Sequence, residues 1–102
     1  MVATVQLTGE WIGHYPGHFD EVVRITQDGE DVEAVKVTGD EYVPAGAITW
    51  RANLRTLCGE GQVAEEEFQH PRFIPGKLII LGPERIIFRW EKLGEVEYRR
   101  DD

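Results

Sequence analysis

A lysine, a threonine and an aspartate stand at alternate positions in one short segment of this chain. They are Lys36, Thr38 and Asp40. If the segment is an extended strand, these three side chains share one face while Val35 and Val37 point to the other. The shared row offers an ammonium, a hydroxyl and a carboxylate, which together could bind a polar ligand. The alternative interpretation is an outward-facing polar strip that ends in an ordinary turn, because surface ion pairs are common and weak.

Histidine and cysteine are the residue types that could hold a metal ion. His14 and His18 have a superficial zinc-ligand spacing, with Cys58 and His70 as further donors. Along a continuous strand, residues four apart stand about 13 Å apart, which is too far to share an ion. Only a tight turn would bring His14 and His18 together. We therefore expect loop histidines at the rim of the fold, and no metal.

Catalytic arrangements are weak in this sequence. The absence of serine excludes every serine nucleophile. An enzyme would have to use Cys58 as a nucleophile beside His70, or Asp40 as a base, and no orienting third residue or matched acid stands out. The acidic run 65–67 is most simply a solvated face, and the glycines at 59–61 meet a strand instead of a helix N-terminus. We expect no enzyme and no cofactor.

Length and charge limit the remaining classes of function. A chain of 102 residues supports one hydrophobic core, so we expect a single domain over residues 1–102. Its net charge of −8, without a basic cluster, disfavours nucleic acid as a partner. No apolar run approaches the roughly 20 residues of a membrane span, and no secretory signal is visible at the start. With one cysteine, these features predict a cytoplasmic protein without an internal disulfide.

The elements that position these residues are predicted to be strands. Apolar and polar residues alternate over 48–55 and 84–91, and segments 22–27 and 32–38 flank a hairpin turn at 28–31. Segment 62–67 has helical propensity, but its all-strand neighbourhood favours a strand. Turn signals include Pro71 and the pair Pro75-Gly76.

About eight strands result, and they need a second layer or closure to hide their apolar face. We predict a small all-β, single-domain antiparallel barrel. Gly9-x-Trp11, together with arginines at 99 and 100, resembles the lipocalin signature in which an arginine packs over the tryptophan. A core tryptophan with two solvated arginines is the alternative.

A longer motif carries a second resemblance. The segments 36–40 (Lys-Val-Thr-Gly-Asp) and 43–46 (Val-Pro-Ala-Gly) resemble the central motif of the cyclin-D-binding domain of an F-box protein, which also occurs in the chloroplast EXECUTER proteins. Gly-x-Trp-x-Gly-x-Tyr at 9–15, Gly-His at 17–18, and the segments 75–79 and 88–90 are similar to its flanking parts. The likeness runs from about residue 9 to residue 99. The opening loop is one residue shorter than in the family, and F-box helices are absent, so we expect a stand-alone version of the domain.

The resemblance implies a barrel that binds the C-terminal tails of proteins, in the F-box member those of damaged chains that end in an amide. The implicated pocket residues fall on Lys36 and Asp40. A primary amide has two N–H donors and one acceptor, so Asp40 could accept from its nitrogen while Lys36 donates to its carbonyl. A free carboxylate would place like charge beside Asp40. We expect the remaining ligand contacts from Thr38, Tyr15, His18, Tyr42, Val43 and Trp90.

The sequence thus predicts a peptide-binding module for protein C-termini, amidated ones in particular, acting as a sensor or adaptor in protein quality control. A protease or another degradation factor would be its downstream partner. The alternative is a lipocalin-like carrier of a small apolar ligand, which needs a roomy barrel interior. The preferred tail, the downstream partner and the oligomeric state are not determined by the sequence.

Overall fold

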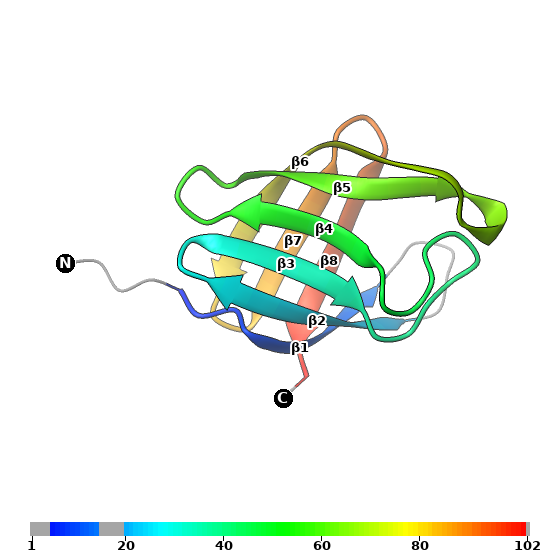
Figure 1. Ribbon diagram of the computed structural model, residues 1–102. Coiled ribbons are helices and arrows are strands. Elements are labelled where there is room, and N and C mark those ends of the chain that lie inside the picture. The colour runs from blue at the N-terminus through cyan, green and yellow to red at the C-terminus, as the bar shows by residue number, and fades with distance from the viewer. Residues whose placement is uncertain (1–4, 15–19, 102) are drawn as a thin grey trace.

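Alternating apolar side chains divide the chain into strands that curl into a closed antiparallel barrel (Figure 1). The computed structural model describes residues 5–14 and 20–101. Within these residues the strands are β1 (Gly9–His14), β2 (Glu21–Asp28), β3 (Asp31–Lys36), β4 (Ile48–Asn53), β5 (Cys58–Glu65), β6 (Gln69–Gly82), β7 (Arg85–Trp90) and β8 (Gly94–Arg100). Each strand pairs with the next, and β1 pairs with β8. The predicted all-β barrel is confirmed.

Large side chains fill the interior of the barrel. Trp11, Trp50, Phe88 and Tyr98 are fully buried. Trp50 stacks on Phe88 with ring centroids 4.8 Å apart, and Trp90 meets the edge of Phe88 at 4.9 Å. Aromatic pairs in these geometries add about 0.5–1.5 kcal/mol each beyond their buried area. The core is therefore packed, and aromatic rings make up a large part of it.

An arginine covers the buried tryptophan of the first strand, as the Gly-x-Trp signature predicts. The guanidinium carbon of Arg100 lies 4.6 Å from the centre of the Trp11 ring. Arg100 also donates to the carbonyl oxygens of Gln6 and Thr8, and the indole N–H of Trp11 donates to Leu7 at 2.9 Å. Leu7 is fully buried. Strands β1 and β8 thus hold the segment before β1 across one end of the barrel.

The third strand is shorter than its sequence pattern predicts. We expected strand over 32–38, but β3 ends at Lys36. The N–H groups of Val37 and Thr38 both donate to the carbonyl of Val22, so the chain turns away from β2 at this point. The strand prediction was therefore wrong for Val37 and Thr38. The apolar–polar alternation continues through these residues, but their hydrogen bonds to β2 no longer follow the strand pattern.

The strand predicted over 48–55 likewise ends at Asn53. The side-chain oxygen of Asn53 accepts hydrogen bonds from the N–H groups of Arg55 and Thr56, which makes a turn.

The ambiguous segment 62–67 is mostly strand. β5 runs to Glu65 and a three-residue 3-10 turn, Glu66–Phe68, follows it. In that turn Glu67 and Phe68 have φ of 61° and 56°. This turn is the helical segment found among the described residues, and it is far too short to span a membrane.

Two prolines that were expected to mark turns lie inside a long strand. β6 continues through Pro71 and Pro75 to Gly82. Its pairing with β7 starts only at Gly76, so both prolines stand where β6 has β5 as its one paired neighbour. Proline lacks the N–H that a second neighbour would require, and it is therefore tolerated at such an edge.

β4 and β5 pair over three positions only, from Ala52↔Gly59 to Trp50↔Gly61. Beyond Gly61 the two strands separate, and the β5–β6 hairpin projects past β4 as an arm (Figure 1). We call this part, residues 62–75, the β5–β6 arm. It lies beside the loop that joins β3 to β4, because the N–H of Glu67 donates to the carbonyl of Glu41 at 2.8 Å.

Candidate functional site

A buried lysine, Lys36, stands at the end of β3, near the point where β4 and β5 separate. Lys36 follows Val32 and Ala34 on the inner face of the strand, and its side chain is 1% exposed. Its Nζ lies 2.9 Å from Glu21 Oε2 and 2.9 Å from Asp40 Oδ2. A buried ammonium is costly unless it is paired and hydrogen-bonded. One cation therefore joins two carboxylates, one from the start of β2 and one from the β3–β4 loop.

Asp40 is held in place by the loop that contains it. Its Oδ1 accepts hydrogen bonds from the N–H groups of Tyr42 at 2.7 Å and Val43 at 2.6 Å. The N–H of Asp40 donates to the carbonyl of Val43, which closes the turn. The side chain keeps 19% of its surface exposed. Asp40 is thus a fixed acceptor in which three of about four lone-pair sites are used, by Tyr42, Val43 and Lys36.

Glu21 is the second carboxylate of the group, and the sequence reasoning did not select it as a site residue. Its side chain is 6% exposed, and its Oε1 is buried without a hydrogen-bond partner among the described residues. The signal that could have found it is the alternation of β2, in which Glu21, Val23 and Ile25 share the inner face. A carboxylate in register with core residues, opposite an inward lysine, predicts a buried ion pair.

The two carboxylates have pKa values displaced in opposite directions. Burial raises the pKa of Glu21 above its ordinary 4.5, and the hydrogen bond and attraction of Lys36 offset only part of this effect. Burial alone would also raise the pKa of Asp40. The hydrogen bonds from Val43 N–H, Lys36 and Tyr42 N–H outweigh it and hold the pKa below its ordinary 3.8. As pH falls, Glu21 therefore takes up a proton before Asp40 does.

These opposite displacements predict how replacing Glu21 changes the dependence of stability on pH. A carboxyl whose pKa is raised by folding stabilises the folded state at low pH, and this contribution disappears as pH rises from 4.5 through the folded value. The Glu21→Gln variant does not titrate at this position. As pH rises from 4.5 to the folded pKa of Glu21, the free energy of unfolding of the variant should therefore rise relative to that of the parent chain. Outside this pH range, the difference between the two proteins should stay constant. Urea denaturation of both proteins from pH 4 to pH 8 measures the difference. A constant difference would contradict the raised pKa.

A cavity of about 570 Å³ opens beside Lys36 and Asp40. Its wall comes from the β3–β4 loop, β4, the β5–β6 arm and the β7–β8 turn. The lining residues are Lys36, Asp40, Tyr42, Val43, Thr49, Gln62, Val63, Ala64, Trp90, Leu93, Gly94, Glu95 and Val96. Its charged groups are the ammonium of Lys36, which joins Asp40 to Glu21, and the carboxylates of Asp40 and Glu95, the latter paired with Arg89 at 3.0 Å. This balance disfavours an anionic ligand group.

Trp90 reaches across the barrel to the parting of β4 and β5. Its indole N–H donates to the carbonyl of Gln62 at 3.2 Å, and the Gln62 side chain donates to the carbonyl of Ile48 at 2.5 Å. Only glycine fits at position 61, because a Cβ there would overlap the indole of Trp90. The last residue pair between β4 and β5 is Trp50↔Gly61. Directly beyond it, the side chains of Trp90 and Gln62 bond the main-chain oxygens of Gln62 and Ile48, so side chains and not a strand pairing meet these oxygens at the cavity.

The residues predicted for the site fall into three groups. Five of them line the cavity: Lys36, Asp40, Tyr42, Val43 and Trp90. Thr38 does not line it. Its hydroxyl accepts the N–H of Val22 at 2.9 Å, so it ties the loop to β2, and the predicted single row of Lys36, Thr38 and Asp40 does not form. Tyr15 and His18 lie outside the described residues.

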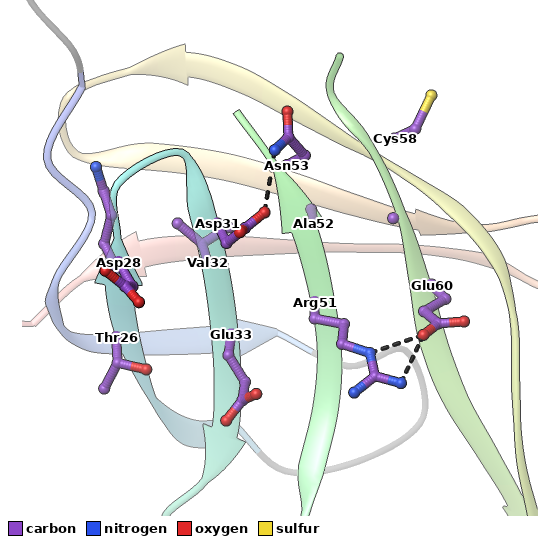
Figure 2. Close-up of a pocket in the computed structure, with 12 residues that line it drawn as sticks. Thr26, Asp28, Asp31, Val32, Glu33, Arg51, Ala52, Asn53, Cys58 and Glu60 are labelled. Atoms are coloured by element: carbon purple, nitrogen blue, oxygen red, sulfur yellow. Dashed lines mark hydrogen bonds and ion pairs between the residues drawn. The ribbon is translucent and has the colours of Figure 1, made fainter. Parts of the chain in front are cut away.

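A second hollow, of about 640 Å³, lies near the β2–β3 hairpin turn, and Figure 2 shows the side chains that line it. Lys36 stands at the other end of β3. Carboxylates outnumber cations among the residues that line the hollow, with Asp28, Asp31, Glu33 and Glu60 against Arg51. Arg51 pairs with Glu60 at 2.6 Å, and the Asn53 amide donates to Asp31 at 3.0 Å. These side chains are exposed, and they bring no buried polar group into the hollow. The chemistry of the protein is therefore better sought at Lys36 and Asp40.

The other ligand and nucleophile candidates stay apart. His14 bonds Asp20 at 2.7 Å, and His70 bonds Glu65 at 2.6 Å. Cys58 begins β5 and His70 follows the end of that strand, so roughly 20 Å of extended chain separates them. Across residues 5–14 and 20–101, no three His, Cys, Asp or Glu side chains converge on a metal position.

Comparison with known proteins gives one family match. The model of the family described as "Cyclin D1 binding domain" matches residues 4–58 and 53–100. Two chloroplast proteins of Arabidopsis thaliana are similar: EXECUTER 1 is 37% identical over 51% of this chain, and EXECUTER 2 is 38% identical over 52%. EXECUTER 1 of Oryza sativa subsp. japonica is 37% identical over 60% of the chain.

The chain spans about a tenth of the length of these relatives, between 10% and 12%. Each of them is named as a chloroplastic protein. The cytoplasmic location expected from the sequence is contradicted by this finding. The expectation was wrong because a lone cysteine and the absence of a signal describe a reducing compartment, and they do not distinguish one such compartment from another.

Proposed function

Because this chain belongs to the cyclin D1 binding domain family, we propose that its barrel binds the C-terminal end of other polypeptides, with a preference for ends that carry a primary amide. The observation that carries the proposal is the fixed carboxylate of Asp40 at the wall of the cavity. The description of the family as a domain that binds a protein supports a polypeptide as the ligand. The preference for an amide end is taken from the resemblance to the F-box member of the family, which recognises amidated tails.

The charge of the cavity supports a neutral end. Asp40 lines the wall, Lys36 is already bonded to Asp40 and to Glu21, and the Glu95 carboxylate on the same wall is paired with Arg89. A terminal carboxylate would meet a surplus of negative charge there, and it has no proton to donate to Asp40. An amide nitrogen has two N–H donors, one of which can bond Asp40. Rejection of a group that leaves a polar partner unsatisfied is the stronger kind of specificity.

Lys36 takes a different role in this proposal from the one its sequence motif implied. With 1% of its side chain exposed, it lies behind Asp40 and fixes the position and ionisation of that carboxylate. The ligand contact is then made by Asp40, while Tyr42, Val43 and Trp90 supply apolar and aromatic surface for the last residues of the tail.

Such a domain would act as a sensor or adaptor for damaged chains in protein quality control, with a degradation factor downstream. The names of the relatives support a chloroplast setting for that role. The carry-over is limited to this domain, since the rest of each relative lies outside the match.

A matched peptide library tests the proposal. Each peptide is prepared with a CONH₂ end and with a COOH end, and both forms are titrated against the full 102-residue chain by fluorescence anisotropy. We expect saturable binding in which the amide form is at least about 10-fold tighter than the acid form. Equal affinities for the two ends would overturn the amide preference. No binding to either form would overturn the proposal as a whole.

A further inference from the structure

The β5–β6 arm has two strand edges, and they differ in chemistry. One edge is the side of β6 that faces away from β5. Among the described residues, no strand pairs with this side over 69–75, and Pro71 and Pro75 lie on this stretch. Prolines at a strand edge discourage pairing, because they remove main-chain donors. On the other edge, β5 pairs with β4 only as far as Gly61, and the residues that follow contain no proline. The edge of β5 is therefore the one open to a further strand.

The open part of the β5 edge is short and has defined ends. At one end, the carbonyl of Gln62 is occupied by Trp90, and at the other the N–H of Glu67 is bonded to Glu41. Between them lie Val63, Ala64 and Glu65 of β5, and Glu66, which begins the 3-10 turn. Ala64 is the residue at which the β5–β6 register shifts. No strand pairs with Val63 or Ala64 on the β4 side among the described residues.

This edge forms a wall of the cavity that Asp40 and Lys36 also line. Val63 and Ala64 are half-buried and belong to that wall, together with Tyr42 and Val43 from the opposite loop. An extended chain rises about 3.3 Å per residue, so the edge from Val63 to Glu65 accommodates two or three residues of a bound peptide. A peptide whose end reaches Asp40 can thus place the residues before that end along β5.

We propose that the last two or three residues of the bound tail pair with the edge of β5 at Val63–Glu65, as an added antiparallel or parallel strand. This inference rests on the proposed function and names how the rest of the ligand is held. Main-chain hydrogen bonds of this kind give affinity without demanding a particular side chain. The domain would then read the chemistry of the chain end at Asp40 while accepting varied sequences before it, which is what a sensor of damaged ends requires.

The charge beside the edge defines the occupant further. Glu65 ends the open segment, Glu66 and Glu67 follow it, and Glu41 lies beside Glu67. A tail with acidic residues in its last positions meets repulsion from this acidic group. The occupant is therefore an extended, amide-ended tail whose final residues are neutral or basic.

Backbone N-methylation of the ligand tests the pairing. The amide-ended heptapeptide that binds tightest in the library is prepared in versions with a single methyl group on each of its last four main-chain nitrogens. In a paired strand, alternate N–H groups face the edge. Alternate versions should then lose about 5- to 10-fold in affinity, the value of a lost hydrogen bond, while their neighbours change by less than about 3-fold. The neighbouring positions serve as matched controls.

A measurement on the protein complements the peptide series. Hydrogen exchange of the Val63 to Glu65 amides is compared with and without the unmethylated peptide, and we expect slower exchange on binding. If the parent peptide binds and prefers its amide end, but N-methylation shows no alternation and these amides gain no protection, the edge pairing is overturned and the proposed function stands. If no amide-ended peptide binds, both are overturned.

Discussion

Replacing Asp40 by asparagine should abolish most binding of amide-ended peptides, and the variant should still fold, because Lys36 keeps the carboxylate of Glu21 as a partner. Asparagine keeps an oxygen that can accept the N–H groups of Tyr42 and Val43, so the turn in the β3–β4 loop is preserved. Its NH₂ group, however, replaces the oxygen that faces Lys36 and the cavity. A donor then faces the amide donor of the ligand. Hydrogen bonds to charged groups are worth about 1.5–3 kcal/mol, so the loss should be about 100-fold.

The measurement is a titration of the same amide-ended peptide with the parent chain and with the Asp40→Asn variant. Asp28→Asn is the matched control, because it makes the same chemical change in the β2–β3 hairpin, at the opposite end of β3. The control should bind like the parent chain. Circular dichroism and a thermal melt establish that both variants are folded. Binding by Asp40→Asn within 3-fold of the parent would remove Asp40 from the proposed site.

Replacing Lys36 by methionine should destabilise the barrel more than any surface change. Methionine fills a similar space, but it leaves the carboxylates of Glu21 and Asp40 without their shared cation. Breaking a buried ion pair by removing one partner costs about 3–5 kcal/mol, since a charge remains uncompensated. For a domain of this size, the lower figure corresponds to a fall in Tm of at least about 12 °C at pH 7. Urea denaturation measures the free energy directly.

The pH dependence of this cost separates charge from packing. Near pH 4 the two carboxyls of the Lys36→Met variant become neutral more easily than at pH 7, so the penalty should shrink. The double variant Lys36→Met, Glu21→Gln should recover part of the stability at pH 7, because one uncompensated charge is gone. Lys77→Met is the control on an exposed lysine of β6, and it should change the free energy of unfolding by less than about 0.5 kcal/mol. A Lys36→Met cost below about 1 kcal/mol at pH 7 would show that the buried pair is not needed for stability.

The two experiments together distinguish recognition from support. Asp40 is expected to change affinity strongly and to lower stability less than Lys36 does, because Lys36 keeps Glu21 as a partner when Asp40 is replaced. This division follows from exposure, since 19% of the Asp40 side chain and 1% of the Lys36 side chain are accessible. A residue that acts through its neighbour is a positioning residue, and its effect on the ligand is indirect.

The amino-acid sequence by itself determined the architecture. Period-two alternation, as in β4 and β7, marks strands with one buried face, and about eight of them in 102 residues require closure or a second layer. Local pattern sufficed for the strands, since alternation depends only on neighbours along the chain. The lipocalin-like signature pointed to arginines at 99 and 100, and the long-range β1–β8 pairing that closes the barrel placed Arg100 over Trp11.

Only the tertiary structure decided the composition of the site. The spacing of Lys36, Thr38 and Asp40 suggested one row, but the strand ended at Lys36, which left Thr38 bonded to β2 and placed Asp40 in a loop. Glu21, which is 15 residues from Lys36 in the sequence, reaches it because the β2–β3 pairing sets Val23 opposite Lys36. Such partners are fixed by long-range pairing and by the need to neutralise a buried charge, and neither is written in the local order of residues.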